Sequence, residues 1–384
     1  MKKEVMLLDT TLREGEQTPG VSFSIDQKLR IALLLDEIGV DMIEAGDPNV
    51  SPDAGRFIER VSGMGLKAEI VAHCRAMVKD IDKAAATGAQ RVAIFLGTSR
   101  SHLKSKLGID EGEAIETVVM AVERAVSHGL PVRFAAEDAT RTNRDFLLEI
   151  CRAAVEAGAD RVSVPDTVGV LTPDEARSLF RKLASALEAG IDTHNHNDLG
   201  LALANTLAAI EGGASCAHVT VNGLGERSGI ASLAGLAMAL KVHYNIDTVA
   251  IDGLIELGLM VERFSGVQVP LNSPVVGKHA FSHKAGVHTA AVLKDPSTYE
   301  AFPPELINRR RKIVIDKYAG RSAVKARLAE LGIAPDDHTL KKIVKAIKDE
   351  PLKGSYSDRD FLDLAQNAGA NYRQIQSHGK AFND

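Results

Sequence analysis

The sequence predicts an α/β protein, a (β/α)8 TIM barrel followed by a mainly helical C-terminal subdomain. A short apolar run followed by a segment with helical spacing recurs eight times between residues 5 and 242, close to the ~250 residues typical of this barrel. Turn sequences such as IGVD, TGAQ and AGAD end most of the helical segments, where glycine can take a left-handed conformation. The doubly wound sheet is the competing fold, but no G-x-G-x-x-G follows the first strand.

The eight predicted strands are short apolar runs that end in polar residues. They cover residues 5–9, 42–46, 68–74, 91–97, 132–138, 161–167, 190–197 and 218–223. The eight predicted helices have apolar residues three and four positions apart and cover residues 24–38, 52–61, 77–87, 111–127, 143–157, 172–187, 201–211 and 230–242. Ser24 and Gln27 form an S-x-x-Q capping box at the start of the first helix.

Polar residues gather where the predicted strands end, and active sites of such barrels lie at the C-terminal ends of the strands. These residues are Asp9, Arg13, Glu14, Glu44, His73, Arg75, Glu137, Asp138, Asp166, Thr167, His194, His196, Asn222 and Glu226. We therefore expect residues 1–245 to form the catalytic domain. Residues 246–384 should form a linker and a subdomain with helices at 251–264, 322–331, 336–350 and 358–368.

Composition excludes several classes of protein. The net charge is −5 and the sequence has no long basic or apolar run, so we expect neither nucleic-acid binding nor a membrane span. Three cysteines lie far apart and form no C-x-x-C, and no secretory leader is expected, which indicates free thiols in a cytoplasmic protein. With no tryptophan, the core must consist mainly of Leu, Ile, Val and Ala.

The segment IDTHNHNDLG at residues 191–200 predicts a metal site. In a strand, His194 and His196 project to the same face, and neutral imidazoles bind divalent metals. Glu14, in the segment DTTLREGEQ, would add a carboxylate and leave metal positions open for substrate. The alternatives are ordinary polar residues at a strand end and a surface salt-bridge loop. The strand-end pattern of the whole chain favours the metal site.

Arg133 is the expected determinant of substrate choice. Alternation in VRFAAEDATR places Arg133 and Ala135 on one face of a strand. If that face is inward, the guanidinium needs a negative partner, which is either a substrate carboxylate or an internal acid. The glycine-rich VNGLGERSG, a weak signal for an anion site, and SHKAGVH, with two histidines and a lysine, complete the candidate motifs.

Four motifs in order, DTTLREGEQ, HNHND, NGLGERSG and HKAGVH, resemble the Claisen-condensing branch of the DRE-TIM metallolyase family. That branch holds homocitrate, isopropylmalate and citramalate synthases, and the resemblance covers residue 1 to about residue 331. It implies a TIM barrel, a divalent metal ion (Mg, Mn, Zn or Co) and acetyl-CoA as co-substrate. It also implies a homodimer in which the subdomain reaches over the partner's active site.

The resemblance also implies roles for single residues. The implied metal ligands are Glu14, His194 and His196. Arg13 would polarise the 2-oxo group of the substrate, and Glu137 and His288 would form the acid/base pair for the acetyl group. The implied contacts to the 2-oxo acid are His73, Arg133 and Thr167.

Within the branch the sequence is most similar to homocitrate synthases. Glu14 in place of Asp, and DPSTYE after HKAGVH, are similar to that group, and Arg133 suits the distal carboxylate of 2-oxoglutarate. Ala135, where the lysine-biosynthesis members often carry serine, leaves a related 2-oxo acid and pathway open. The alternatives are isopropylmalate or citramalate synthase, and a metal-dependent C–C lyase on the same barrel. A non-catalytic binding protein is disfavoured by the complete set of ligands.

Overall fold

The computed structural model describes residues 5–349 and 354–370. The chain divides into two compact units, Met1–Pro270 with Pro274–Val276, and Leu271–Ser273 with Gly277–Asp384. The domain boundary between residues 245 and 246 stays a prediction. Helix α9 (Leu254–Ser265) belongs to the first unit, where it packs on α1 (Ile25–Ile38). In the part of the chain that is described, no helix is both long and apolar enough to cross a membrane.

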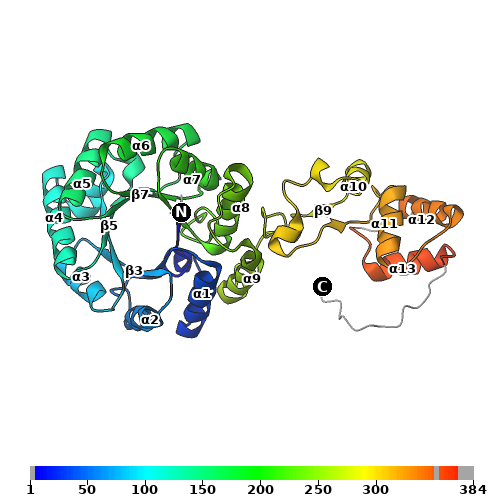
Figure 1. Cartoon of the computed structure of the whole chain (residues 1–384), viewed down its shortest axis with the longest axis horizontal. Helices are drawn as coiled ribbons and strands as arrows, with labels where there is room; N and C mark the ends of the chain where they lie inside the picture. Colours follow the sequence, from blue (N-terminus) through cyan, green and yellow to red (C-terminus); the bar gives the residue numbers. More distant parts are fainter. Residues whose placement is uncertain (1–4, 350–353, 371–384) are drawn as a thin grey trace. The chain divides into compact units, whose positions relative to one another are not determined.

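The first unit is a closed barrel of eight parallel strands, which confirms the predicted fold (Figure 1). The strands pair in chain order, and β1 closes the barrel against β8 with Met6 opposite Cys216. Parallel pairing brings all the C-terminal strand ends to one rim. The strands are β1 Met6–Asp9, β2 Met42–Gly46, β3 Glu69–Arg75, β4 Arg91–Gly97, β5 Val132–Glu137, β6 Arg161–Asp166, β7 Gly190–Asn195 and β8 Cys216–Val219.

Helices α1 to α8, one after each strand, surround the barrel (Figure 1). The predicted capping box is present at α1, where the Ser24 side chain accepts from the Gln27 amide, and Gly39 ends the helix at φ 87°. Fully buried side chains such as Leu7, Ile43 and Phe57 fill the space between sheet and helices. The remaining helices are α2 Pro52–Ser62, α3 Val78–Ala85, α4 Glu111–Ser127, α5 Arg144–Glu156, α6 Pro173–Ala186, α7 Ala202–Glu211 and α8 Leu233–Tyr244.

Strand β8 differs from the expected 218–223. It begins at Cys216 and ends at Val219, and a short 3-10 helix, η4 (Val221–Gly223), follows. Asn222 has φ 58° and Gly223 has φ 72°, left-handed values that a strand cannot contain. The earlier start of β8 places His218 within the strand, with a buried side chain. A π-helix after β4, η2 (His102–Leu107), was not predicted.

The second unit has a core of its own, which includes Ile313, Val324, Ile343 and Phe361. Two short parallel strands, β9 (Ser282–His283) and β10 (Lys312–Ile313), are its only strands among the described residues. Its helical character confirms the prediction, with α10 Gly286–Val292, α11 Arg321–Glu330, α12 Asp337–Asp349 and α13 Asp358–Asn367. The predicted end of the third helix of the subdomain, Glu350, and residues 371–384 lie outside the described residues.

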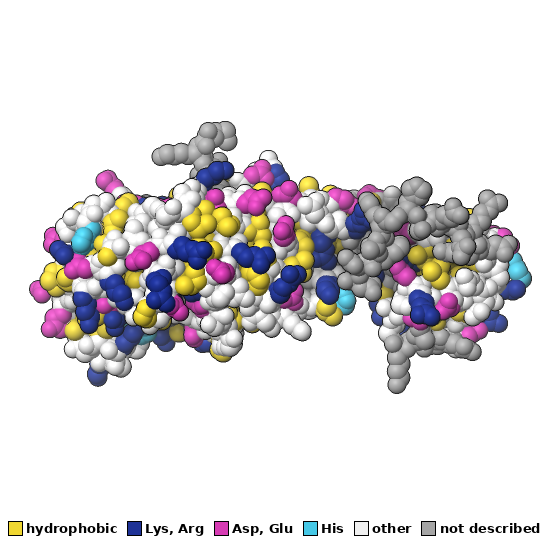
Figure 2. All heavy atoms as spheres, turned by 90° about the horizontal axis from the view of Figure 1, so that it is seen from below, with side chains coloured by type: hydrophobic (Ala, Val, Ile, Leu, Met, Phe, Trp, Pro, Cys, Tyr) yellow, Lys and Arg dark blue, Asp and Glu magenta, His cyan; other side chains and the backbone are white. Residues whose placement is uncertain are grey.

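Charged side chains of both signs are interspersed with hydrophobic ones on the face of the barrel unit seen in Figure 2. This mixture agrees with a net charge of −5 on a chain with 46 basic and 51 acidic residues. That face of the barrel unit therefore presents no broad basic surface of the kind that binds a nucleic-acid backbone.

Candidate active site

A cavity of about 310 Å³ is lined by residues from the C-terminal ends of the strands and the loops after them. It brings together every barrel residue for which a role was expected: Arg13, Glu14, His73, Arg133, Glu137, Thr167, His194 and His196. Residues of this cavity without an expected role include Gln17, Phe95, Ser163, His218 and Arg227. His288 belongs to the second unit.

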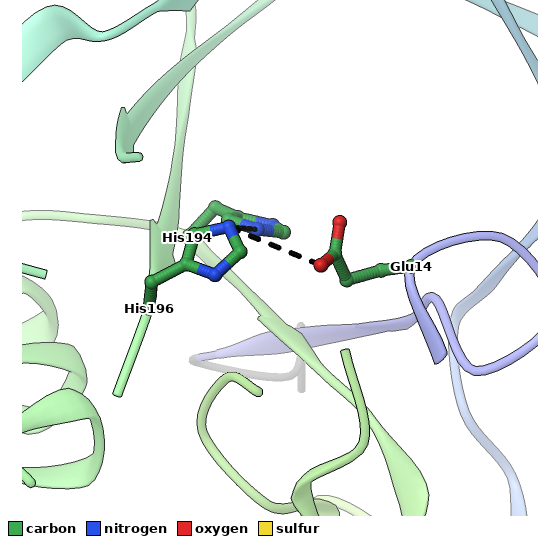
Figure 3. Close-up of side chains that lie close together, drawn as sticks. All are labelled: Glu14, His194 and His196. Atoms are coloured by element: carbon green, nitrogen blue, oxygen red, sulfur yellow. Dashed lines mark hydrogen bonds and ion pairs between the residues drawn. The ribbon is translucent and has the colours of Figure 1, made fainter. Parts of the chain in front are cut away.

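Glu14, His194 and His196 form a compact group of possible metal ligands (Figure 3). One ligand atom from each lies within 4.8 Å of the others, and all three residues are buried. The two Nε2 atoms of the histidines are 3.4 Å apart, and His196 Nε2 is 4.0 Å from Glu14 Oε1. The histidines come from β7 and the residue after it, whereas Glu14 comes from the loop after β1, so only closure of the barrel assembles the group.

The glycine-rich loop after β8 positions the Glu14 carboxylate. The backbone amide of Glu226 donates to Glu14 Oε1 over 2.9 Å. Gly225 has φ 151°, and a Cβ atom there would lie 2.9 Å from the same oxygen, so glycine permits this close approach. The anion that this loop contacts is therefore a side chain of the protein itself.

Both histidines have the protonation state that metal binding requires. Burial, together with the neighbouring His196, holds the pKa of His194 well below its ordinary value. Burial also lowers the pKa of His196, although the Glu14 carboxylate opposes this effect. The imidazoles are therefore neutral at pH 7 and offer ring lone pairs. Two neutral imidazoles and one carboxylate are a donor set that fits a divalent metal ion.

Arg133 points into the barrel and forms an ion pair with Glu44 of β2. The internal acid that the sequence left open is therefore present. Glu44 also accepts from Arg13 Nε at 2.7 Å and from the Thr10 hydroxyl at 2.6 Å. Arg13 in turn contacts Glu14 Oε2 at 2.6 Å, so one buried network joins both guanidiniums to the proposed metal ligand.

Glu44 carries its charge in spite of complete burial. Burial raises the pKa of its carboxyl, but Arg13 and Arg133 outweigh that effect and hold the pKa well below its usual range. One carboxylate is thus shared between two guanidiniums. Arg133 Nε has no hydrogen-bond partner, so the guanidinium keeps a donor that Glu44 does not satisfy.

His73 and Thr167 reach the cavity from different strands. His73 lies on β3, and Thr167 directly follows β6. The His73 ring stacks on Phe95 with centroids 4.6 Å apart. Burial lowers the pKa of His73 to about 3, so this histidine is neutral and can donate or accept a hydrogen bond. The hydroxyl of Thr167 accepts from the Asp138 amide at 2.9 Å, which fixes the orientation of the side chain.

Glu137 ends β5 and is half-buried at the edge of the cavity. Lys106, from the π-helix η2, donates to both of its carboxylate oxygens at 2.8 and 2.6 Å. His102 Nδ1 lies 3.7 Å from the same carboxylate. The π-helix therefore supplies Glu137 with one donor, Lys106, and places the His102 ring beside it. π-helical turns frequently occur at functional sites.

His288 lies on α10 in the second unit and is exposed. Its ring stacks on Tyr299 with centroids 4.1 Å apart. The other two polar residues of the HKAGVH motif are paired, His283 with Glu300 at 3.1 Å and Lys284 with Asp316 at 2.7 Å. Within the motif, His288 is thus the side chain left available to a reactant.

Sequence reasoning gave no role to Glu44, Asp192 or His218, all of which are buried in or beside the cavity. The sequence contained a feature that could have indicated an inward-facing role for two of them. Asp192 precedes His194 by two residues and so shares its strand face, and Glu44 is a carboxylate in the apolar run MIEAG. His218 had no such signal, because the predicted strand began at this residue.

Comparisons with known proteins identify the family of the chain. The HMGL-like family matches residues 4–261, and a domain described as homocitrate synthase post-HMGL domain-like matches residues 275–353. The homocitrate synthase of Sulfolobus acidocaldarius is 50% identical over 94% of this chain and 79% of its own length. That of Sulfurisphaera tokodaii is 49% identical over 94% of this chain and 80% of its own length.

Solved structures show the same barrel at low identity. The hydroxymethylglutaryl-CoA lyase of Pseudomonas aeruginosa matches with a TM-score of 0.63 and 22% identity, over 70% of this chain and 95% of that one. The HMG-CoA lyase of Brucella melitensis has a TM-score of 0.62 and 20% identity, over 69% of this chain and 99% of that one. Likeness at this level concerns the fold, whereas the family matches span most of the sequence. The chain therefore belongs to the HMGL-like family, in the DRE-TIM group that its motifs resemble.

Proposed function

We propose that this chain is a homocitrate synthase, which condenses acetyl-CoA with 2-oxoglutarate and releases homocitrate and CoA. The observation that carries the proposal is one cavity that holds three possible metal ligands, Glu14, His194 and His196 (the metal-binding trio). The guanidiniums of Arg13 and Arg133 line the same cavity. Homocitrate synthases about half identical over 94% of the chain support the same reaction. The three cysteines are free, which supports the reducing cytoplasm as the location of the enzyme.

Glu14, His194 and His196 would hold the divalent metal. When bound, the metal supplies Lewis acidity to the 2-oxo group of the substrate. The donor set does not distinguish zinc from manganese, cobalt or magnesium, so the metal itself is a matter for measurement.

Arg13 and Arg133 would bind and polarise the 2-oxo acid. Arg13 contacts Glu14 and Glu44, so its guanidinium is fixed beside the trio, where an alkoxide develops as the new C–C bond forms. Arg133 would meet the distal carboxylate of 2-oxoglutarate with the donors that Glu44 leaves available. His73 and Thr167, on the cavity wall, would contact the remaining substrate oxygens.

Glu137 and His288 would serve the acetyl group. A base must remove a methyl proton of acetyl-CoA before the resulting carbon nucleophile attacks the 2-oxo carbon. Water then cleaves the thioester, so CoA leaves as a thiol and the condensation becomes irreversible. We place His288 in the active site of the other subunit of a homodimer, because it is exposed on a unit separate from the barrel.

The test is thiol release from acetyl-CoA with 2-oxoglutarate, 2-oxoisovalerate or pyruvate as the second substrate. A homocitrate synthase releases CoA fastest with 2-oxoglutarate, whereas preference for 2-oxoisovalerate or pyruvate would identify an isopropylmalate or citramalate synthase. No release with any of the three, together with cleavage of a hydroxyacyl-CoA, would identify a lyase.

Arg133→Ala tests the basis of that choice. It should raise the KM for 2-oxoglutarate by orders of magnitude, because the distal carboxylate of this substrate would lose its charged partner in the site. The KM for acetyl-CoA should stay nearly unchanged. Arg91→Ala, which breaks the partly buried ion pairs of Arg91 with Glu69 and Asp160 away from the cavity, controls for general destabilisation. Normal use of 2-oxoglutarate by Arg133→Ala would limit Arg133 to its ion pair with Glu44.

A further inference from the structure

Two buried side chains form a hydrogen-bonded series with His194. They contact the Nδ1 side of its ring, whereas the Nε2 side faces His196. His194 Nδ1 lies 3.2 Å from His218 Nδ1, and His218 Nε2 lies 3.1 Å from Asp192 Oδ2. The three residues are 5%, 2% and 0% exposed, so water does not compete for these contacts. Arg161 binds the other oxygen of Asp192 at 2.6 Å.

Only one placement of hydrogens satisfies all of these contacts and leaves His194 able to bind a metal. Asp192 accepts, so His218 carries its hydrogen on Nε2 and has a lone pair on Nδ1. His194 then donates from Nδ1, which leaves the lone pair on its Nε2, the atom that faces His196. The reverse placement would put the Nε2 lone pair of His218 against the Asp192 carboxylate and a hydrogen on His194 Nε2.

Arg133 competes for the same ring nitrogen. Its Nη1 atom lies 3.3 Å from His218 Nε2 and can only donate, so this contact would favour a lone pair on Nε2. The Asp192 carboxylate is closer, at 3.1 Å, and can only accept, so we assign the hydrogen to Nε2 and treat the Arg133 contact as a close approach.

We propose that Asp192 and His218 are positioning residues that hold His194 as its Nδ1–H tautomer and direct its Nε2 lone pair at the metal. The proposal rests on the metal site proposed above. Partners of this kind orient metal-binding histidines in many proteins, and their loss typically lowers metal affinity about 10- to 100-fold.

A second metal bound by Asp192, Cys216 and His218 is the competing explanation, since their ligand atoms also lie within 4.8 Å of one another. The charges argue against it. Arg161 already neutralises Asp192, and Arg133 lies against His218, so an incoming cation would meet two guanidiniums.

Two variants of His218 separate its contacts. The amide of His218→Asn occupies the place of Nδ1 and can still accept from His194, whereas that of His218→Gln occupies the place of Nε2 and contacts Asp192 only. Metal-free protein is titrated with Co²⁺ alone, and affinity and the visible absorption of bound Co²⁺ are recorded. We expect His218→Gln to lose about 10- to 100-fold in affinity with an altered spectrum, and His218→Asn to retain most of it. Cys216→Ala, a buried neighbour outside the hydrogen-bonded chain, should bind as the native protein does.

Equal binding by the Asn and Gln variants, or the reverse order, would overturn the proposal, and two bound Co²⁺ per chain would establish the competing site. A second experiment uses the native protein, so it does not depend on whether the variants fold.

The ¹⁵N chemical shifts of the His194 ring nitrogens are measured in labelled, metal-free protein. We expect the shifts of the Nδ1–H tautomer, and an Nε2–H tautomer refutes the proposal. If His194→Ala binds Co²⁺ as well as the native protein does, the metal site itself has failed, which is a different result.

Discussion

Glu44→Gln should destabilise this protein far more than a change of one atom usually does. Glu44 is fully buried and accepts from Arg13, Arg133 and Thr10. Glutamine removes the charge that two guanidiniums share. Arg13 keeps Glu14 as a partner, but Arg133 is left without a carboxylate. Breaking a buried ion pair by removing one partner costs ~3–5 kcal/mol, and we expect about 3 kcal/mol here because the amide oxygen still accepts one hydrogen bond.

Urea unfolding of the metal-free protein at pH 7 measures this cost. The double variant Glu44→Gln/Arg133→Met removes both charges of the pair, so it should cost less than the two single variants together, with a coupling of about 0.5–3 kcal/mol. Asp247→Asn is the control, because it breaks an exposed pair with Lys241, and such pairs contribute about 0–1 kcal/mol.

The pH dependence provides a second check on Glu44. A carboxyl whose pKa is lower in the folded protein stabilises it above the unfolded value of 4.5, and this contribution is lost as the pH falls below that value. The stability gap between native protein and Glu44→Gln should therefore narrow in acid. A loss below about 1 kcal/mol at pH 7, or strictly additive single variants, would refute the shared-charge account.

Three further expectations concern the site. His196→Ala removes a proposed ligand, so bound divalent metal and turnover should fall together; stoichiometric metal with full activity would exclude His196 from the ligand set. Burial raises the pKa of Asp9 to about 7 from 3.8, so the folded protein holds this proton more tightly than the unfolded chain and loses stability as the pH rises from about 4 to 7. Asp9→Asn should therefore melt above the metal-free native protein at pH 8, by a margin that shrinks towards pH 4, whereas a constant margin would contradict the shift. His288→Ala and Glu14→Ala are each expected to be inactive alone, but verified heterodimers of the two should recover some activity if His288 acts across subunits; no recovery would place it in its own chain or outside the reaction.

The strand–helix alternation and the strand-end residues were readable from the sequence because they depend on local spacing. Burial of both faces makes parallel strands continuously apolar, so runs such as VMLLD and MIEAG were recognisable, and the closed barrel confirmed them. The H-x-H spacing at the end of β7 likewise predicted two imidazoles on one face, because residues two apart in extended backbone point the same way.

The partners of those residues were decided by the tertiary structure. Glu44 lies 89 residues before Arg133, and His218 lies 24 residues after His194, so no local pattern relates either pair. The left-handed residues after β8 belong to a turn, so the strand ends at Val219 and not at Gly223; it also begins two residues earlier than expected, at Cys216, which places His218 within the strand. Sequence spacing thus determined which side chains face inward. The tertiary structure determined which of them meet, because pairing of β7 with β8 brings His218 to His194, and closure of the barrel brings Glu44 of β2 to Arg133 of β5.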